Sequence, residues 1–289
     1  MKISLIICSR NRAERLRQSL RHLNAVEAPD CLVEVVVVDS FSTDDTPSVI
    51  KKFVPISKIP VKTVRTGRPG LGYARNCGIE CSDGDIISFT DDDCELDKNY
   101  FKALQKAFTP ETFLYGAGQI VISDESLDTR LASISFTQRT EIPAGLPLMP
   151  FGAMQGANIF FARRVFELCG LFNEDMGAGT RFPCEDLEMG WRASNRGLVG
   201  ALIPEIVVHH HHGLKKGSSE ADAAVASYDR ARGAYLASLL AQGSLKVWLH
   251  WAESFSPNGA LIGKERYAQL GRELQGAGEY FEFLGDRKV

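Results

Sequence analysis

Three consecutive aspartates, Asp91, Asp92 and Asp93, follow an apolar run at residues 86–89. Adjacent carboxylates at the end of a buried strand repel one another unless a cation lies among them. Oxygen-rich sites suit Mg²⁺ or Mn²⁺, and these ions also bridge substrate phosphates. One aspartate here would more simply cap the next helix, which is expected over residues 97–108. Three together favour a divalent-cation site.

A second acidic pair, Glu185 and Asp186, opens a stretch with helical spacing that continues to residue 195. Acids at a helix N-terminus complement the helix dipole, and that alone can explain them. A carboxylate held beside a reacting hydroxyl can also serve as a general base. The residues themselves leave both interpretations open.

Four consecutive histidines, residues 209–212, close an apolar run that ends at Val208. Alternate residues of a strand share one face, so His210 and His212 are expected on the same side as Val208. We expect one of the four histidines to complete a metal site with the aspartates, and His210 is nearest the strand. The alternative is adventitious binding of transition metals by exposed imidazoles.

A glycine-rich segment at residues 67–75 has the look of a dinucleotide-binding loop. The position of the third glycine holds Arg75, and the segment does not follow the first strand, so that interpretation fails. The glycines instead allow a tight loop into a helix. Arg75 is then available to phosphate or sugar oxygens.

Short apolar runs alternate with helix-like stretches in the first hundred residues. The runs are 3–8, 33–38, 61–64 and 86–89, and the helical stretches are 12–23, 43–53 and 71–79. This order predicts an α/β fold with a mostly parallel, Rossmann-like central sheet. Thr43 is expected to cap the helix that contains Pro47. Ligands of such sheets bind beyond the carboxyl ends of the strands.

The pattern loosens after residue 108. Strands are expected over residues 113–122, 158–162 and 198–208, a loop over 143–155, and helices over 185–195, 221–242 and 264–274. A cluster of Gly, Lys and Ser at 213–219 suggests a boundary. We therefore expect one domain over residues 1–213 and a helical C-terminal extension over 214–289.

Composition limits the kinds of partner. The net charge of −3 and the pI of about 6.1 argue against nucleic acid, and the seven cysteines form no C-x-x-C pair, so they are expected to be free thiols. The N-terminal apolar run is too short for a signal peptide, and no segment has 18 consecutive apolar residues. These features predict a cytoplasmic protein. A Leu- and Trp-rich stripe at 233–251 suggests peripheral contact with the inner face of the cell membrane or a homodimer contact.

The motifs occur in a familiar order. They are Ser-Arg-Asn-Arg (9–12), Val-Val-Val-Val-Asp-Ser (35–40), Ser-Thr-Asp-Asp-Thr (42–46), Ala-Arg-Asn-Cys-Gly-Ile (74–79), Phe-Thr-Asp-Asp-Asp (89–93), Gln-Gly-Ala-Asn (155–158), Gly-Leu-Phe-Asn-Glu (170–174) and Cys-Glu-Asp-Leu-Glu-Met-Gly-Trp-Arg (184–192). Together they resemble glycosyltransferase family 2, with its GT-A fold, over residues 1–213. The resemblance implies metal-dependent, inverting transfer of a sugar from a nucleotide-diphosphate donor, most simply a UDP-sugar, to a hydroxyl of a carbohydrate or lipid-linked acceptor in polysaccharide or glycoconjugate synthesis.

The same resemblance implies roles for individual residues. The nucleotide would be bound by Ser9, Arg10, Asn11, Arg12, Asp39, Arg75, Asp91 and Asp92, with Asp39 at the base. Mn²⁺ or Mg²⁺ would be bound by Asp93, Asp91 and His210. Asp186 would be the catalytic base, with Glu185 as the second candidate, and Gly156, Asn158 and Trp191 would lie on the sugar and acceptor side. Ser40 stands where the family often has a second acid. This difference weakens the prediction that Asp39 recognises the nucleoside base of the donor.

Two other functions fit a similar sheet. A sugar-phosphate nucleotidyltransferase would need a glycine-rich pyrophosphate loop after the first strand, and residues 9–12 contain no glycine. A non-catalytic protein that binds carbohydrate or nucleotide would share the motifs. Release of nucleotide diphosphate from a donor without acceptor separates an enzyme from a binder.

Overall fold

The computed structural model describes residues 1–27, 32–108, 113–131, 133–253 and 264–287. The strands are β1 (Lys2–Ser9), β2 (Leu32–Asp39), β3 (Val61–Arg65), β4 (Ile86–Asp91), β5 (Cys94–Leu96), β6 (Tyr115–Val121), β7 (Thr140–Ile142), β8 (Ile159–Ala162) and β9 (Gly200–His210). The helices are α1 (Ala13–Leu23), α2 (Thr46–Phe53), α3 (Leu71–Cys81), α4 (Tyr100–Ala107), α5 (Arg163–Cys169), α6 (Glu185–Asn195), α7 (Ser219–Ala241), α8 (Leu245–Glu253) and α9 (Lys264–Asp286). Short 3₁₀ turns cover Val54–Ile56 and Gly156–Asn158.

The strands form one mixed sheet in the order β3-β2-β1-β4-β8-β6-β9-β5, with β7 also paired to β9. The first four strands are parallel, as predicted, and β6 runs parallel to β9. Strand β8 is antiparallel to both β4 and β6, and the short strands β5 and β7 are antiparallel to β9. The predicted α/β class and largely parallel sheet are confirmed.

The register explains how distant polar residues meet. Ser9 pairs with Asp39 across β1 and β2, and Cys8 pairs with Asp91 across β1 and β4. Because parallel strands end at the same edge, the motifs that follow them lie side by side. The central strands are buried on both faces, with residues 35–38 fully inaccessible, so the edge is held on a rigid core.

One alternative is excluded, and one local expectation was wrong. The segment after the aspartates forms β5, and α4 begins only at Tyr100, so the aspartates do not cap that helix. The hydroxyl of Thr43 lies 3.3 Å from Oδ1 of Asn11 and caps no helix. The carboxylate of Asp44 instead accepts hydrogen bonds from the backbone N–H groups of Thr46 and Ala13 at 2.9 and 3.1 Å, which ties the starts of α1 and α2 together.

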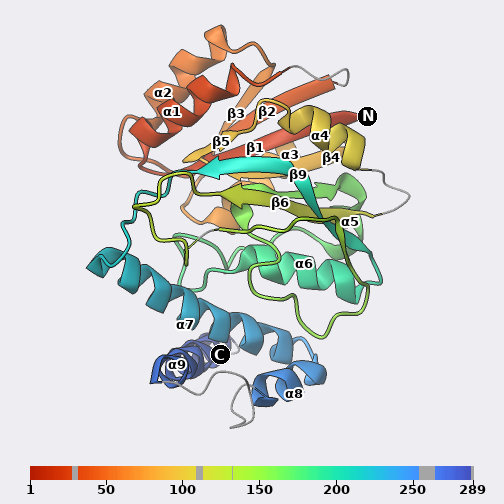
Figure 1. Cartoon of the computed structure of the whole chain (residues 1–289), viewed down its shortest axis with the longest axis vertical. Coiled ribbons are helices and arrows are strands. Elements are labelled where there is room, and N and C mark those ends of the chain that lie inside the picture. The colour runs from red at the N-terminus through yellow and green to blue at the C-terminus, as the bar shows by residue number, and fades with distance from the viewer. Residues whose placement is uncertain (28–31, 109–112, 132, 254–263, 288–289) are drawn as a thin grey trace.

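The C-terminal helices pack below the sheet, beside α6 (Figure 1). Helices α7 and α9 cross closely at two glycines: a Cβ on Gly233 or Gly276 would lie within 2 Å of a backbone oxygen of the other helix.

The predicted helices of the C-terminal part are confirmed, and α9 continues to Asp286. The apolar stripe at 233–251 divides between α7, where Leu236 and Leu239 are buried, and α8, which exposes Leu245, Trp248 and Leu249. No helix in the described part of the chain is long and apolar enough to cross a membrane. The boundary at residue 213 stays a prediction.

Candidate active site

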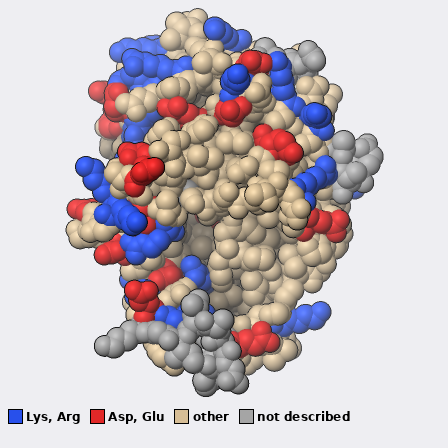
Figure 2. Space-filling view, viewed as in Figure 1, with Lys and Arg blue, Asp and Glu red and all other residues tan. Residues whose placement is uncertain are grey.

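A cavity of about 820 Å³ opens at the carboxyl edge of the sheet. The ends of β1 and β4, the start of α6, His210 and His212 at the end of β9, and part of α7 line it. Figure 2 shows this face hollowed between the sheet and the C-terminal helices, with charged side chains of both signs along its left margin. The two acidic motifs predicted from the sequence therefore face one cavity. We call Asp91, Asp92 and Asp93 the aspartate wall, and Glu185 with Asp186 the α6 acidic pair.

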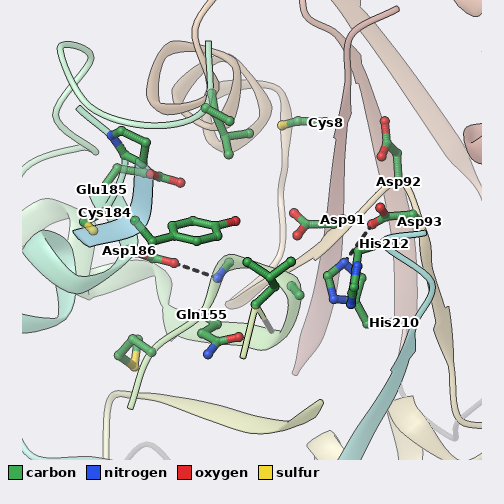
Figure 3. A pocket seen from close by; sticks show the side chains of 18 of the residues that line it. Cys8, Asp91, Asp92, Asp93, Gln155, Cys184, Glu185, Asp186, His210 and His212 are labelled. Carbon is green, nitrogen blue, oxygen red and sulfur yellow. Dashed lines mark hydrogen bonds and ion pairs between the residues drawn. The ribbon is translucent and has the colours of Figure 1, made fainter. Parts of the chain in front are cut away.

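Asp91 and Asp92 of the aspartate wall lie in different surroundings (Figure 3). The Asp91 side chain is 35% exposed and faces the cavity, whereas Asp92 is buried. Asp92 accepts a hydrogen bond of 2.6 Å from the Ser9 hydroxyl and lies 2.8 Å from an Arg12 nitrogen. Burial raises the pKa of Asp92 to about 7, although Arg12 and Ser9 oppose the shift.

Asp93 is surrounded by cationic groups. Its Oδ2 contacts Arg12 and lies 3.1 Å from Nη1 of Arg15, and its Oδ1 lies 3.1 Å from Nε2 of His210. Burial alone would raise the pKa of Asp93, but His210 and Arg12 outweigh burial and hold that pKa well below its usual range. Asp93 is therefore ionised across the neutral pH range.

The strand pairing explains why His210 is the histidine at this wall. Antiparallel pairing sets His210 opposite Cys94, next to Asp93. His209 and His211 point elsewhere, toward Ser123 and Glu95. His210 and His212 both line the cavity, with ring centroids 5.4 Å apart, so the predicted two-residue alternation is confirmed.

The donor atoms at this wall fit a divalent cation. Adjacent ligands of an octahedral ion with bonds of about 2.1 Å lie roughly 3 Å apart, and Asp93 Oδ1 lies 3.1 Å from His210 Nε2. Among the described residues, Asp93, Cys94 and His210 form a group whose ligand atoms all lie within 4.8 Å of one another. Asp91 is not a member of that group, so its predicted share in the metal remains a prediction.

The α6 acidic pair forms the opposite side of the cavity (Figure 3). Asp186 accepts hydrogen bonds of 2.8 Å from the backbone N–H groups of Gly156 and Leu187. Glu185 is buried and forms an ion pair with Arg75. Burial raises the pKa of both carboxyl groups, and the positive charge of Arg75 opposes it.

Arg75 connects the two sides of the cavity. Its side chain is buried, with one nitrogen on Glu185 and the other 4.0 Å from Asp91. Gly156 makes this position possible, because a Cβ there would lie 2.0 Å from Arg75 Nη2. The sequence assigned Gly156 to the acceptor side. In the structure it supports Arg75 and donates its N–H to Asp186.

Three other predicted residues do not line the cavity. Asn158 is fully buried, and its amide bonds the backbone oxygens of Gln119 and Ile206. Trp191 is also buried and donates to the carbonyl of Pro147. These interior contacts correct the assignment of both residues to sugar binding. Asn11, with φ of 53°, accepts from the Thr43 N–H and supports the neighbouring loop.

The remaining predicted nucleotide residues lie at or beside the cavity. Ser9, Arg10 and Arg12 line it. Asp39 lies behind Ser40, which lines the cavity; its Oδ1 accepts from the Ser42 N–H at 2.9 Å, and its Oδ2 lies 3.4 Å from Arg65 Nε. That Oδ2 has no hydrogen-bond partner in the described part of the chain.

No sequence pattern predicts that α7 reaches the cavity. Tyr228 and Arg232, two of its residues, line the wall. Although Tyr228 is 47% exposed, desolvation by the surrounding protein, followed by the negative charges of Asp91 and Asp186, raises the pKa of its phenol. The phenol is therefore neutral and close to both acidic motifs. An aromatic and an arginine within a long helix carry no sequence signal for such a position.

Comparison with known proteins identifies the family of this architecture. Residues 4–168 match the model of the family described as Glycosyl transferase family 2. The glycosyltransferase AglE of Haloferax volcanii is 34% identical over 215 residues, which cover 72% of this chain and 66% of AglE. The poly(ribitol-phosphate) beta-N-acetylglucosaminyltransferase TarS of Staphylococcus aureus is 30% identical over 102 residues, 35% of this chain but only 18% of TarS.

Solved structures share the fold over nearly the whole chain. The mannosyltransferase PcManGT of Pyrobaculum calidifontis, solved with GDP-Man and Mn²⁺, matches 98% of this chain and 75% of its own with a TM-score of 0.60 and 20% identity. TarS residues 1–349 of S. aureus, solved with UDP-GlcNAc, match 97% of this chain and 81% of their own with a TM-score of 0.57 and 17% identity. The C-terminal helices are therefore included in the matched region.

Proposed function

The chain belongs to glycosyltransferase family 2, and from that premise we propose that it transfers a sugar from a nucleotide-diphosphate donor to an acceptor hydroxyl. The observation that carries the proposal is the cavity itself, in which the aspartate wall faces the α6 acidic pair. The aspartate wall suits a cation and a diphosphate, and the α6 acidic pair suits a catalytic base. This pairing fits a displacement reaction between a charged leaving group and a neutral hydroxyl.

The donor would lie along the carboxyl edge of β1, β2 and β4. Asp39 would recognise the base, since its Oδ2 is an acceptor without a hydrogen-bond partner in the described residues and would satisfy a ring N–H. Ser9, Arg10 and Arg12 would surround the ribose and phosphates. TarS was solved with UDP-GlcNAc and PcManGT with GDP-Man, so UDP- and GDP-sugars are the first donors to test.

Mn²⁺ or Mg²⁺ would be held by Asp93 and His210, with Asp91 at the cavity side. When bound, the ion would neutralise the charge that develops on the departing diphosphate. Arg12 and Arg15 are paired with Asp93, so this carboxylate has no proton to lose before a cation binds, whereas Nε2 of His210, which is hydrogen-bonded to Asp93, would have to give up its proton to bind the ion.

Asp186 would act as the base. Glu185 forms an ion pair with Arg75. Asp186 instead accepts hydrogen bonds from backbone N–H groups and lies on the cavity wall. As the acceptor oxygen bonds to the sugar C1 from the face opposite the diphosphate, the C1–O bond to the diphosphate breaks and the hydroxyl proton passes to Asp186. Attack from the opposite face inverts the configuration at C1.

The test is release of nucleotide diphosphate from UDP-, GDP- and dTDP-sugars with Mn²⁺, first without and then with acceptor. We expect one donor to be hydrolysed slowly, and a thermal shift for the same nucleotide that depends on Mn²⁺. Binding without turnover under any condition would indicate a non-catalytic protein. Pyrophosphate released from a nucleoside triphosphate and a sugar phosphate would indicate a nucleotidyltransferase. The predicted role in polysaccharide or glycoconjugate synthesis, membrane contact and homodimer stay predictions.

A further inference from the structure

Arg232 of α7 is a cation at the cavity wall that the reaction proposed above does not use. Its guanidinium lies 4.5 Å above the ring of Phe151, another lining residue. The side chain is about one quarter exposed, and its Nε has no hydrogen-bond partner in the described part of the chain. A guanidinium that is stacked on an aromatic ring and lines a cavity is a typical oxyanion-binding group.

The charges around Arg232 do not balance. Its nearest carboxylates are Asp229 at 3.7 Å and Glu273 at 3.6 Å, both longer than a hydrogen bond. Arg272 binds Asp229 through two nitrogens at 2.9 and 2.7 Å, and Arg266 lies 3.6 Å from Glu273. Three arginines therefore face two carboxylates, and the surplus positive charge is on the member that lines the cavity.

The other lining arginine of this region has no such capacity. Arg130 donates to both carboxylate oxygens of Asp128 and to Asp222 on α7. Its charge is countered twice and its geometry is fixed. Of these two arginines, Arg232 is therefore the better candidate to bind an anionic ligand.

Arg232 belongs to the acceptor side of the cavity. It lies close enough to Cys184, which immediately precedes the α6 acidic pair, to lower the pKa of that thiol in opposition to burial. The aspartate wall has its own cations, Arg12 and Arg15, at the opposite side. A group bound at Arg232 would therefore belong to the acceptor and not to the donor diphosphate.

We propose that Arg232 and Phe151 form an acceptor subsite for a negatively charged group, a phosphate or a carboxylate, carried by the molecule that receives the sugar. This inference rests on the proposed function, because it assigns the acceptor class of the same cavity. The anion compensates the surplus charge at the part of the guanidinium that faces the cavity, while the apolar part of the acceptor lies over Phe151. A neutral acceptor would leave the surplus positive charge without a counter-charge, because the two carboxylates beside Arg232 are shared with Arg272 and Arg266.

The test measures binding of small probes by calorimetry: glycerol 3-phosphate, D-glycerate and neutral glycerol, with saturating UDP and Mn²⁺ filling the donor side. We expect wild-type protein to bind glycerol 3-phosphate, D-glycerate or both at least tenfold more tightly than glycerol. Arg232→Gln should weaken binding of the charged probe at least tenfold, which is the size expected for loss of a charge-assisted contact. Arg232→Lys should keep part of the affinity. The matched control is Arg230→Gln, which removes a neighbouring arginine of α7 that does not line the cavity.

Three results would overturn the inference. They are equal binding of charged and neutral probes, an unchanged affinity in Arg232→Gln, and displacement of glycerol 3-phosphate by UDP, which would place the anion in the diphosphate position. Should Arg232→Gln fail to fold, as judged by its melting curve, the probe comparison in wild type and Arg232→Lys decides. Failure of the proposed function has a different signature, because no nucleotide binds and no donor is turned over. In that case the probe affinities measured without nucleotide still test the role of Arg232.

Discussion

Asp93 and Asp186 face the same cavity from opposite sides, yet their environments drive their proton affinities apart. Asp93 lies among Arg12, Arg15 and His210, and these groups outweigh burial and lower its pKa. Asp186 has backbone N–H donors and a more distant Arg75, so burial dominates and its pKa is raised. Because both residues are aspartates, the different groups around them separate the pKa values of the two carboxylates.

That difference matches two tasks. A carboxylate held ionised is ready to bind a cation, whereas a carboxylate with a raised pKa accepts a proton more readily from a hydroxyl. Arg75 lies between the two motifs, so it can set the charge on both sides at once. Variants that exchange or remove these environments test the comparison directly.

The largest effect is expected for Asp186→Asn. The amide keeps the shape of the side chain but cannot take the proton, so turnover should fall by about 10²–10⁴-fold, the usual contribution of a general base. Nucleotide affinity should stay within a few-fold of wild type. Single-turnover transfer and calorimetry with UDP measure the two quantities. Glu167→Gln, at an exposed position on α5, is the control. Wild-type turnover in Asp186→Asn would move the base to another residue.

Asp93→Asn should abolish the effect of Mn²⁺ on nucleotide binding. Loss of a charged ligand is expected to weaken metal-dependent UDP affinity by at least about 10–100-fold, while the weak metal-free binding remains. Titrations with Mn²⁺ and with EDTA compare the two states. Glu95→Gln is the matched control, because Glu95 contacts His22 and His211 and not His210. If Mn²⁺ still strengthens UDP binding to Asp93→Asn, the cation is bound elsewhere.

The sequence predicted the parts of the fold that depend on local pattern. Short runs rich in apolar and β-branched residues predicted the parallel strands, and 3.6-residue spacing predicted α1, α6 and α7 close to their observed bounds. The position of the aspartate wall was predictable, because parallel strands end at the same edge of a sheet and the aspartates follow one of them. The α6 acidic pair was placed correctly because helix starts leave a clear signal.

What failed depended on long-range packing. Strand β5 has three residues, too few for a pattern, yet its pairing with β9 joins Asp93 to His210. Asn158 and Trp191 were carried over from motifs, but their polar groups bond to interior carbonyls that no spacing reveals. Tyr228 and Arg232 lie at the cavity because α7 packs beside α6, a contact between segments that are separate in the sequence.

Gly156→Ala should disturb both sides of the cavity through Arg75. The new Cβ would lie 2.0 Å from Arg75 Nη2, so the guanidinium must move away from Glu185 and Asp91. We expect kcat/KM to fall by about tenfold or more and the free energy of unfolding to fall by roughly 1–3 kcal/mol, as for other overpacked sites. Gly271→Ala on α9 is the control, since a Cβ there meets nothing within 4 Å. Unchanged kinetics would show that Arg75 does not couple the two sides.

The smallest effect is a shift in the pH profile. A base must be deprotonated to act, so activity should rise with pH through the pKa of Asp186. Because burial raises that pKa, the acidic limb of kcat/KM should lie above the ordinary range of an aspartate. Removing the positive charge of Arg75 with Arg75→Gln should move the limb to still higher pH, since Arg75 opposes the rise. The control Arg230→Gln should leave the limb where it is. A shift to lower pH in Arg75→Gln would mean that the titrating group is not a carboxyl stabilised by that arginine.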